Sequence, residues 1–402
     1  MDGNIRVRNP FIETGFGQEH LIMNRPLRVC WFGTWRREYS RNRILIAGLR
    51  SAGVEVVECH APLWGGVEDR VRLASGGWRH PRFALRLFQA WFRLLTGLRR
   101  TGPWDALVLG YPGLFDVPLA RLAARHRRRK MVLDAFMSPW LIAWERGLVA
   151  RAPFTGRLLH ALERAALAVP DLILQDTPQY AAWTRREFGV PPERVRLVPT
   201  GADTTLFKPN PLPPPTDGSF RVVYVGTFIP NHGVGTMIEA AARLQGEPEI
   251  RFRFVGDGPE RAEAERKART LGLTRVQFDP PLPPERVPAC LAKADLALGA
   301  FGTTPQSLMT IQNKIYEALA TARPVVTGDS PAVRTLFEHG RHLWLCPRQD
   351  AEALAEAIRF LSRHPGLCRT LAEEGYARFR EVGSVEAIGR ALRAHLEEAV
   401  GR

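Results

Sequence analysis

Cysteine, lysine and long apolar runs are scarce in this chain of 402 residues. No apolar stretch approaches the roughly 18 residues that a membrane-spanning helix needs, so the sequence excludes a transmembrane protein. No Cys-x-x-Cys pair occurs, which excludes a zinc site and a disulfide framework and favours reduced thiols in the cytoplasm. The five cysteines are scattered, at Cys30, Cys59, Cys290, Cys346 and Cys368.

The N-terminal segment carries no secretion signal. Residues 1–24 contain acidic residues and glycines but no long apolar core, so we expect a cytoplasmic protein rather than a secreted one. The first strand-like run begins only at Leu27, shortly after Met23. We therefore interpret residues 1–24 as a tail, with either Met1 or Met23 as the start of the natural chain.

Positive charge is concentrated in one half of the chain. The formal net charge is +15, and only five of the basic residues are lysines. Residues 1–200 hold 31 basic and 17 acidic residues, whereas residues 201–402 hold 25 and 24. The N-terminal half is therefore expected to meet an anionic partner, such as phospholipid, a phosphorylated acceptor or nucleic acid. Nucleic acid is disfavoured, because no helix-turn-helix, zinc or RNA-binding signature accompanies the charge.

Short apolar runs alternate with helical stretches along the chain, which is typical of parallel sheets covered on both faces. A proline-rich segment at 206–219 divides these runs into two sets, because its prolines forbid helix and central strand. The sequence therefore predicts an α/β fold with two Rossmann-like domains, 25–205 and 220–385, facing each other across a cleft. The predicted strands are Arg28–Phe32, Val54–Glu58, Ala106–Leu109, Lys130–Leu133, Leu172–Gln175, Val195–Val198, Phe220–Val225, Ile250–Val255, Val276–Phe278, Leu296–Ala300, Pro324–Val326 and His342–Leu345.

Two glycine-containing loops follow predicted strands of the second domain, where ligands of such sheets bind. In the first loop, Gly226 and Gly233 permit close backbone approach, and Thr227 and His232 can add hydrogen bonds. The helix that follows directs free N–H groups at the loop, an arrangement suited to a diphosphate. An ordinary strand-to-helix turn is the alternative for each loop. The second loop contains Gly256 and Asp257.

A predicted helix start combines an amide, an amine and a carboxyl group. Asn313, Lys314 and Glu317 lie there, with Thr310 just before them. We expect Glu317 in the first turn, where the helix dipole favours an anion. An acid at this place can accept hydrogen bonds from two ribose hydroxyls. The alternative is an acidic residue on a solvated helix face.

Taken in order, these motifs resemble those of the family 4 retaining glycosyltransferases, which have the GT-B fold of two Rossmann-like domains. The resemblance implies that the second domain binds a nucleotide-diphosphate sugar, with Glu317 on the ribose and the 226–233 loop facing the diphosphate. It also implies that the first domain binds the acceptor and that a C-terminal helix, residues 386–402, packs back onto it. The motifs are Thr200–Pro209, Tyr224–Gly233, Val255–Pro259, Asn313–Ala320 and Arg323–Val326.

Two features depart from the family pattern. The family usually has a second glutamate eight residues before the ribose-binding one, and Met309 stands there. Sugar recognition must therefore differ, through backbone N–H groups or Thr310. The family also usually has arginine and lysine in the phosphate loop, where this chain has Thr227 and His232. Positive charge must then come from Lys314 or the first domain, and an unperturbed His232 would titrate near neutrality.

The chain contains no Asp-x-Asp motif, which argues against a metal-bound diphosphate. We therefore expect no metal site and no cofactor, the nucleotide sugar being a co-substrate. Helix N-termini, backbone N–H groups and basic side chains would then stabilise the leaving diphosphate.

The loop after the first strand is a candidate acceptor or phosphate site. Gly33 at the strand exit would let this loop approach the donor, and Arg37, Arg41 and Arg43 can hold a phosphate. The alternative is a solvated basic loop.

A second candidate loop, residues 134–138, follows the fourth strand. Asp134 can take the proton of the acceptor hydroxyl or contact the sugar, and Ser138 ends the same loop. We therefore select Asp134 and His232 as the candidate catalytic residues. The alternative for Asp134 is a role in capping or in the turn, because in retaining transfer the leaving phosphate can itself accept the proton.

Residues 79–100 have the pattern of an amphipathic helix. Aromatic and aliphatic residues opposite arginines are typical of a helix that lies on a membrane surface, which favours a peripheral protein on the inner face of the plasma membrane. The alternative is a surface helix whose apolar side packs on the sheet. The expected apolar arc contains Ala84, Leu87, Phe88, Trp91, Leu94, Leu95 and Leu98, and the basic side contains Arg82, Arg86, Gln89, Arg93 and Arg100.

These features predict a metal-independent hexosyltransferase that moves a sugar, with retention, from a nucleotide-diphosphate sugar to a hydroxyl acceptor. A lipid-linked glycan or a polysaccharide of the cell envelope fits as acceptor. One alternative is a non-catalytic nucleotide-sugar-binding protein of the same fold, suggested by Met309 and Thr227. A sugar-nucleotide epimerase is a further alternative, although it would need no acceptor surface.

Overall fold

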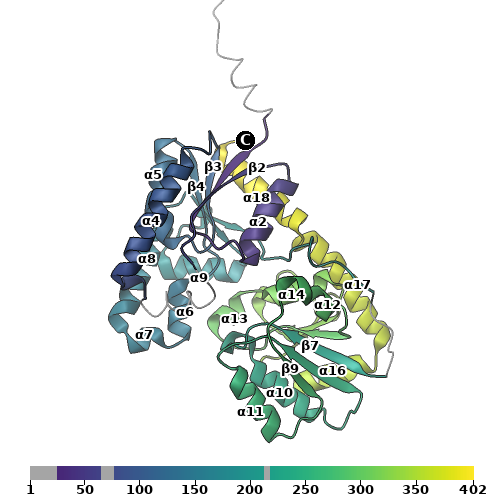
Figure 1. The fold of residues 1–402 in the computed structure, drawn as a ribbon. Helices are drawn as coiled ribbons and strands as arrows, with labels where there is room; N and C mark the ends of the chain where they lie inside the picture. The colour runs from purple at the N-terminus through teal and green to yellow at the C-terminus, as the bar shows by residue number, and fades with distance from the viewer. Residues whose placement is uncertain (1–24, 65–76, 212–217) are drawn as a thin grey trace, which may run out of the picture.

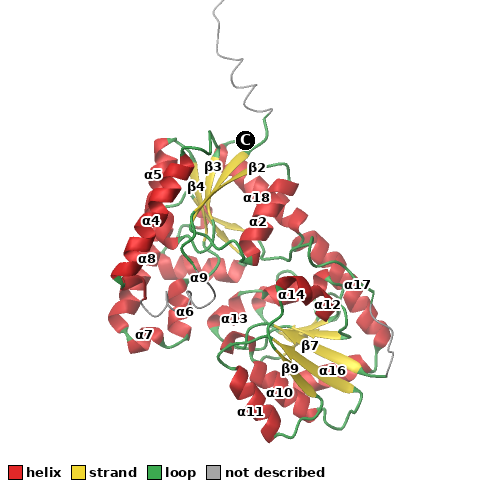
Figure 2. Ribbon diagram, in the orientation of Figure 1, coloured by secondary structure: helices red, strands yellow, loops and turns green. Residues whose placement is uncertain are grey.

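The computed structural model describes residues 25–64, 77–211 and 218–402. The predicted tail and the central part of the predicted linker lie outside these described residues. Two domains are present, each built on a parallel sheet of six strands. Figure 2 shows helices on both sides of each sheet. The structure therefore confirms the predicted α/β fold with two Rossmann-like domains.

The N-terminal sheet has the strand order β2-β1-β3-β4-β5-β6. Its side chains alternate between two buried faces, with Cys30 and Phe32 on one and Val29 and Trp31 on the other. This double burial explains the near-continuous apolar runs from which the strands were predicted. The strands are β1 (Arg28–Gly33), β2 (Glu55–His60), β3 (Ala106–Leu109), β4 (Lys130–Asp134), β5 (Leu172–Gln175) and β6 (Val195–Leu197).

Helices cover both faces of this sheet. Leu94, Ala120 and Leu167 come from three helices that pack on the face of Phe32. Ile44 and residues of the last helix pack on the other face. The helices are α2 (Ser40–Ser51), α4 (Pro81–Leu98), α5 (Val117–His126), α6 (Pro139–Glu145), α7 (Leu148–Arg151), α8 (Pro153–Ala168) and α9 (Pro178–Phe188), with short 3-10 turns at Gly77–Arg79, Leu114–Asp116 and Pro192–Arg194.

The C-terminal sheet has the strand order β12-β11-β10-β7-β8-β9. Every strand in it overlaps the run predicted from the sequence. Tyr224 and Phe254 face one core, and Val223 and Val255 face the other side. The strands are β7 (Phe220–Val225), β8 (Ile250–Val255), β9 (Val276–Asp279), β10 (Leu296–Leu298), β11 (Val325–Gly328) and β12 (Trp344–Cys346).

The helices of the C-terminal domain follow the same two-sided plan. Met237 and Leu354 belong to the core on the side of Tyr224, and Ile315 belongs to the core on the opposite side. The helices are α10 (Val234–Arg243), α11 (Arg261–Thr270), α12 (Val287–Leu291), α13 (Pro305–Met309), α14 (Asn313–Ala320), α15 (Pro331–Arg334), α16 (Ala351–Ser362), α17 (Pro365–Val382) and α18 (Val385–Val400), with 3-10 turns at Pro230–His232 and Pro284–Arg286.

The chain crosses between the domains twice, at neighbouring places. After α17, the chain enters α18, which packs on α2 in the N-terminal domain through Ile388 and Leu392 (Figure 1). The backbone N–H of Ala202, on the first crossing, donates to the carbonyl of Gly383 at 3.1 Å. Phe207, which the sequence placed in the linker, is buried in the C-terminal core. The C-terminal domain therefore begins before most of the prolines of the predicted linker.

Polar contacts also join the domains across the cleft. The N–H of Gln306 donates to Glu145 Oε1 at 2.6 Å, and Asn313 Nδ2 donates to Ser40 Oγ at 2.6 Å. The first contact holds α13 against the end of α6, and the second holds the start of α14 against the start of α2. Among the described helices, none is both long and apolar enough to cross a bilayer.

Candidate functional site

A cavity of about 300 Å³ lies between the two domains, where the sequence predicted a ligand site. A second cavity of about 310 Å³ adjoins it, and Tyr39, Val287 and Glu317 line both. The first cavity collects most of the predicted donor residues. These are Gly226, Thr227, His232, Thr310, Asn313, Lys314 and Glu317.

The loop after β7 passes directly over a lysine. A Cβ atom at Gly226 would collide with Lys314 Nζ, so a larger residue here would displace the end of the lysine side chain. Gly233 has a φ of 63° at the start of α10, and a Cβ there would lie 2.7 Å from Gly302 N. Gly233 therefore lies against the backbone of a neighbouring segment at Gly302 and does not line the cavity.

Lys314, Tyr224 and His232 form a compact polar cluster beneath this loop. Lys314 Nζ lies 2.9 Å from Tyr224 Oη and 3.1 Å from His232 Nδ1. The Tyr224 hydroxyl donates to the carbonyl of Thr227 at 2.8 Å, and His232 Nδ1 lies 2.6 Å from the same carbonyl. Because a carbonyl only accepts, Nδ1 carries the proton in this arrangement and Nε2 is the acceptor of the ring.

The charges in this cluster differ from those expected. Burial, and then the neighbouring Lys314, lower the pKa of His232 well below its usual value. His232 is therefore not the unperturbed histidine that would titrate near neutrality, because its surroundings favour the neutral ring. Burial also lowers the pKa of Lys314 well below its usual range, although Glu317 opposes this shift. An anion bound in the cavity would restore the positive charge on Lys314.

Glu317 lies at the junction of the two cavities. It is the fifth residue of α14 and so lies in the second turn, not in the first turn as predicted. Burial raises the pKa of its carboxyl to about 7, while Lys314 and Arg43 lower it. The helix dipole therefore does not account for this acid, whereas two nearby cations do favour its ionised form.

Other predicted donor residues stabilise the loops around the cavity. The Thr310 hydroxyl donates to the carbonyl of Gln306 at 2.9 Å. Asp257 Oδ1 accepts the N–H of Gly258 at 2.8 Å, and a Cβ at Gly256 would collide with the carbonyl of Gly226. Gly256 and Asp257 are thus turn residues in the described structure, which corresponds to the alternative given for that loop.

Met309, the position of the missing glutamate, lies at the end of α13. Its carbonyl accepts a hydrogen bond from Thr177 Oγ1 of the N-terminal domain, and its side chain does not line the described cavity. The residue therefore joins the two domains through its backbone.

The structure places Arg41 and Asp134 inside the N-terminal domain and not at an acceptor site as predicted. Both side chains are fully buried, and Arg41 Nε lies 2.8 and 2.9 Å from the two oxygens of Asp134. The reason is that α2 begins at Ser40, so Arg41 belongs to the helix rather than to the predicted loop and points into the domain. Arg41 therefore does not face a phosphate, and Asp134 does not face an acceptor hydroxyl.

Three further predicted residues also lie away from the cavities. Gly33 approaches Asp116 rather than a donor, since its Cβ would lie 2.9 Å from Asp116 Oδ2. Ser138 is buried and caps α6, accepting the N–H of Leu141 at 3.1 Å. Arg37 is exposed near Glu58. Of the predicted arginines only Arg43 lines a described cavity, beside Glu317.

Two sequence profiles match the chain in succession, one for each domain. Residues 42–206 match the family described as Glycosyltransferase Family 4. Residues 219–364 match the family described as Glycosyl transferases group 1. The chain belongs to the family 4 glycosyltransferases. The two matched ranges contain both sides of the cavity described above.

This family 4 glycosyltransferase is similar to curated proteins with related names. It is 26% identical to the MMP alpha-(1->4)-mannosyltransferase of Mycolicibacterium hassiacum over 351 residues, 84% of this chain and 79% of the relative. It is 29% identical to the putative colanic acid biosynthesis glycosyltransferase WcaL of Salmonella typhimurium over 299 residues, 67% and 72% of the two chains. Transfer of a glycosyl group is the activity that these names share.

Solved structures show the same fold. HepE of Anabaena in complex with UDP-glucose has a TM-score of 0.65 and 17% identity, covering 92% of this chain and 100% of that one. Sucrose-phosphate synthase of Thermosynechococcus elongatus has a TM-score of 0.68 and 19% identity, covering 93% and 99%. These likenesses establish the arrangement of the two domains of this family 4 glycosyltransferase.

Sequence reasoning missed the residues that the N-terminal domain contributes to the site. Tyr39, Phe136, Met137 and Arg146 line the first cavity. Arg146 follows the end of α6, and no motif or spacing marked it. The only signal available was the family departure at Thr227, which predicted that positive charge would come from Lys314 or from the first domain.

Gly226→Ala is expected to weaken nucleotide binding about tenfold or more, since Lys314 must move away from the loop to accommodate the methyl group. Gly235→Ala is the matched control, because a Cβ there meets nothing within 4 Å. Calorimetric titration with UDP, GDP and ADP measures the effect. Equal affinities of the two variants would contradict the role of this close approach.

Proposed function

We propose that this family 4 glycosyltransferase transfers a sugar from a nucleoside-diphosphate sugar to a hydroxyl acceptor with retention of the anomeric configuration. One observation carries the proposal. A lysine, a glycine loop and a carboxyl group line a single cavity between the domains, at Lys314, Gly226 and Glu317. This order of groups suits a diphosphate at one end and a ribose at the other.

The diphosphate is proposed to lie against cations from both domains. Lys314 lines the cavity from the C-terminal domain and Arg146 lines it from the N-terminal domain. Arg146 thereby supplies the charge that Thr227 lacks. The start of α14 has no side-chain cap, so its backbone N–H groups add to the stabilisation. Together these groups stabilise the negative charge that develops on the leaving diphosphate.

In the proposed reaction, the bond between the anomeric carbon and the diphosphate oxygen breaks, and its electron pair leaves with the diphosphate. The acceptor oxygen forms the new bond on the same face of the sugar, and its proton passes to the departing phosphate oxygen. No carboxylate base is needed, consistent with the burial of Asp134. The neutral ring of His232 is proposed to accept a hydrogen bond from a sugar hydroxyl through Nε2.

The acceptor is proposed to be a hydroxyl of a glycan, either lipid-linked or part of a polysaccharide. The named relative from Salmonella typhimurium acts in colanic acid biosynthesis, as its name states, which supports an acceptor of this class. The second cavity, lined by Arg36, Ser40 and Arg43 from the N-terminal domain, offers polar side chains to which such an acceptor can bind. The cytoplasmic location predicted from the sequence stays a prediction.

Release of nucleoside diphosphate from a panel of UDP-, GDP- and ADP-sugars tests the proposed function. We expect turnover with at least one donor, undiminished by excess EDTA, because side chains rather than a divalent cation neutralise the diphosphate. Lys314→Met is expected to lower turnover about 100-fold or more, in line with the loss of a transition-state charge contact.

The control for Lys314→Met is Lys293→Met. Lys293 is an exposed lysine of the same domain and lies outside both cavities. Nucleotide binding without turnover on any donor, with glycan acceptors supplied, would favour the non-catalytic binding protein. Loss of turnover with EDTA, restored by a divalent cation, would contradict metal independence.

A further inference from the structure

Helix α4 exposes a stripe of large apolar side chains. Leu85, Phe88, Phe92 and Leu95 are 60%, 63%, 69% and 44% exposed. Their spacing of three and four residues places them on one face of the helix. Aromatic and leucine side chains gathered in this way mark an interaction surface rather than ordinary surface variation. We call these four residues the α4 stripe.

The stripe is distinct from the side of α4 that packs on the sheet. Ala90, Leu94 and Leu98 are buried in the N-terminal core, and Trp91 is half-buried and donates to Asp116 Oδ1 at 3.1 Å. The single apolar arc expected from the sequence is therefore divided. One part packs on the sheet, as the alternative for this helix required, and the other part faces outward.

Arginines lie along the remaining face of the helix. At 100° per residue, Arg82, Arg86 and Arg93 fall on the arc next to the stripe. Arg100 follows two residues after the helix ends at Leu98, and all four arginines are exposed. Arg86 also donates to the carbonyl of Leu63. On this part of α4 the apolar and cationic side chains are thus neighbours.

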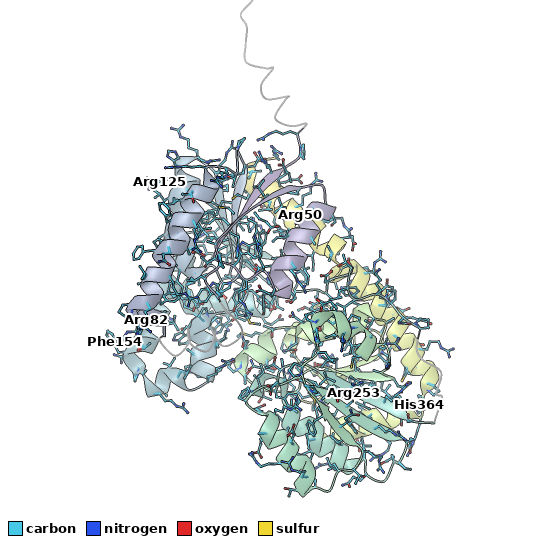
Figure 3. All side chains as sticks on the ribbon, viewed as in Figure 1. Arg50, Arg82, Arg125, Phe154, Arg253 and His364 are labelled. Carbon is cyan, nitrogen blue, oxygen red and sulfur yellow. The ribbon has the colours of Figure 1, made fainter. Side chains whose placement is uncertain are left out.

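Aromatic and basic side chains also lie on the elements next to the two ends of α4. Near its start, the guanidinium of Arg79 lies 5.7 Å from the ring centre of Phe154, which is 68% exposed at the start of α8. Near its end, Arg127 donates to the carbonyl of Leu98 at 3.4 Å and brings the basic end of α5 alongside. Figure 3 shows Arg82, Phe154 and Arg125 along the outer edge of the N-terminal domain, on the side away from the C-terminal domain.

We propose that the α4 stripe and its arginines bind the surface of an anionic phospholipid bilayer. An interfacial helix buries its apolar side chains about 5–10 Å into the headgroup boundary while its basic residues meet the anionic headgroups. The net charge of residues 1–200 has the matching sign, with 31 basic against 17 acidic residues. The proposal concerns docking and does not depend on the transfer reaction.

A second copy of this chain fits the α4 stripe less well than an anionic bilayer does. Pairing two α4 stripes would place two rows of arginines side by side, and like charges in close contact oppose association. An anionic bilayer instead compensates every one of these charges. The charge on this face therefore favours the lipid surface over self-association.

Flotation with vesicles of phosphatidylcholine alone, or with phosphatidylglycerol added, tests the proposal on the full chain. We expect strong binding only to the anionic vesicles. Phe88→Ser with Phe92→Ser is expected to lower the partition coefficient roughly tenfold per residue. Arg93→Gln with Arg100→Gln is expected to lower it about 5-fold per residue.

Matched controls come from exposed residues of the C-terminal domain. Leu271→Ser with Phe360→Ser, and Arg363→Gln with Arg369→Gln, are expected to bind like the unchanged protein. Release of nucleoside diphosphate from a nucleotide sugar in solution should be equal in all variants. Failure of docking is therefore distinguishable from failure of the proposed function.

Three outcomes would overturn the proposal. These are absence of binding to either vesicle, unchanged binding of the α4 variants, or a dimer in light scattering that Phe88→Ser with Phe92→Ser converts to a monomer without any vesicle binding. The last result would assign the stripe to a second copy of the chain.

Discussion

Glu317→Gln is expected to lower nucleotide affinity about 100-fold, because each hydrogen bond to a charged group contributes about 1.5–3 kcal/mol and the carboxylate can accept two from a ribose. The amide of glutamine keeps the size of the side chain and can accept only through one neutral oxygen. Calorimetric titration with the nucleoside diphosphate measures the loss.

The pH dependence of the same affinity gives a sharper test. The carboxyl of Glu317 has a pKa raised to about 7 by burial, so below this pH it is protonated and accepts ribose hydroxyls poorly. Affinity should therefore fall up to about tenfold per pH unit on the acid side. Lys314 has a pKa lowered well below its usual range by burial. Above that pKa the amine is neutral, and affinity should fall again as the pH rises.

The two limbs of this bell-shaped profile can be assigned separately. Glu317→Gln should flatten the acid limb, since the amide does not titrate. Lys314→Arg should flatten the alkaline limb, since a guanidinium stays charged throughout the range. Glu338→Gln, an exposed carboxyl beside Arg341, is the control and should preserve both limbs. A flat profile in the unchanged protein, or full affinity in Glu317→Gln, would contradict the proposed ribose contact.

Arg41→Met is expected to destabilise the protein by about 3–5 kcal/mol, because it leaves the buried Asp134 carboxylate without a partner. Both side chains have no exposed surface. Burial opposes the charge on Arg41, but the attraction of Asp134 outweighs it and raises the pKa of the guanidinium above its usual value. Asp176 is also buried close by, with a pKa raised to about 7 by burial. Removal of the arginine therefore leaves two carboxyl groups in one apolar environment.

Thermal unfolding followed by circular dichroism measures this effect, and a midpoint lowered by roughly 6–20 °C corresponds to the expected loss. Arg41→Met with Asp134→Leu should recover much of the stability, because a buried ion pair replaced by apolar residues of similar size is often neutral.

The double variant also separates the two roles considered for Arg41. If it folds, its nucleotide affinity should equal that of the unchanged protein, because neither residue lines a described cavity. A folded double variant with lost nucleotide affinity would instead restore Arg41 as a phosphate ligand. A single variant that loses less than about 1 kcal/mol would contradict the importance of the buried pair.

Much of the fold and half of the site follow from local sequence. Most of the described strands are readable because they are short apolar runs that only a sheet covered on both faces can bury. The C-terminal half of the candidate site is readable for a related reason. Gly226 directly follows a strand, Lys314 lies in the first turn of α14 and Glu317 in the second, so the topology of a parallel sheet brings them to the same edge.

The direction in which a single side chain points could not be predicted from the sequence, because it depends on packing between distant segments. Arg41 and Arg43 are two residues apart, yet Arg41 points into the core toward Asp134 while Arg43 lines a cavity beside Glu317. The difference arises from the start of α2 at Ser40, which sequence pattern places only within a few residues. Arg146 reaches the cavity from the opposite domain, and no local pattern records that approach.

The sequence by itself thus determined the two sheets, their separation and most residues that line the first cavity from the C-terminal domain, because periodicity and strand-to-helix turns are local properties. Only the tertiary structure decided which arginines meet the cavity and which part of residues 79–100 faces outward. The physical reason is that burial of a side chain depends on which distant elements cover it, as Ala90 and Phe88 on the same helix show.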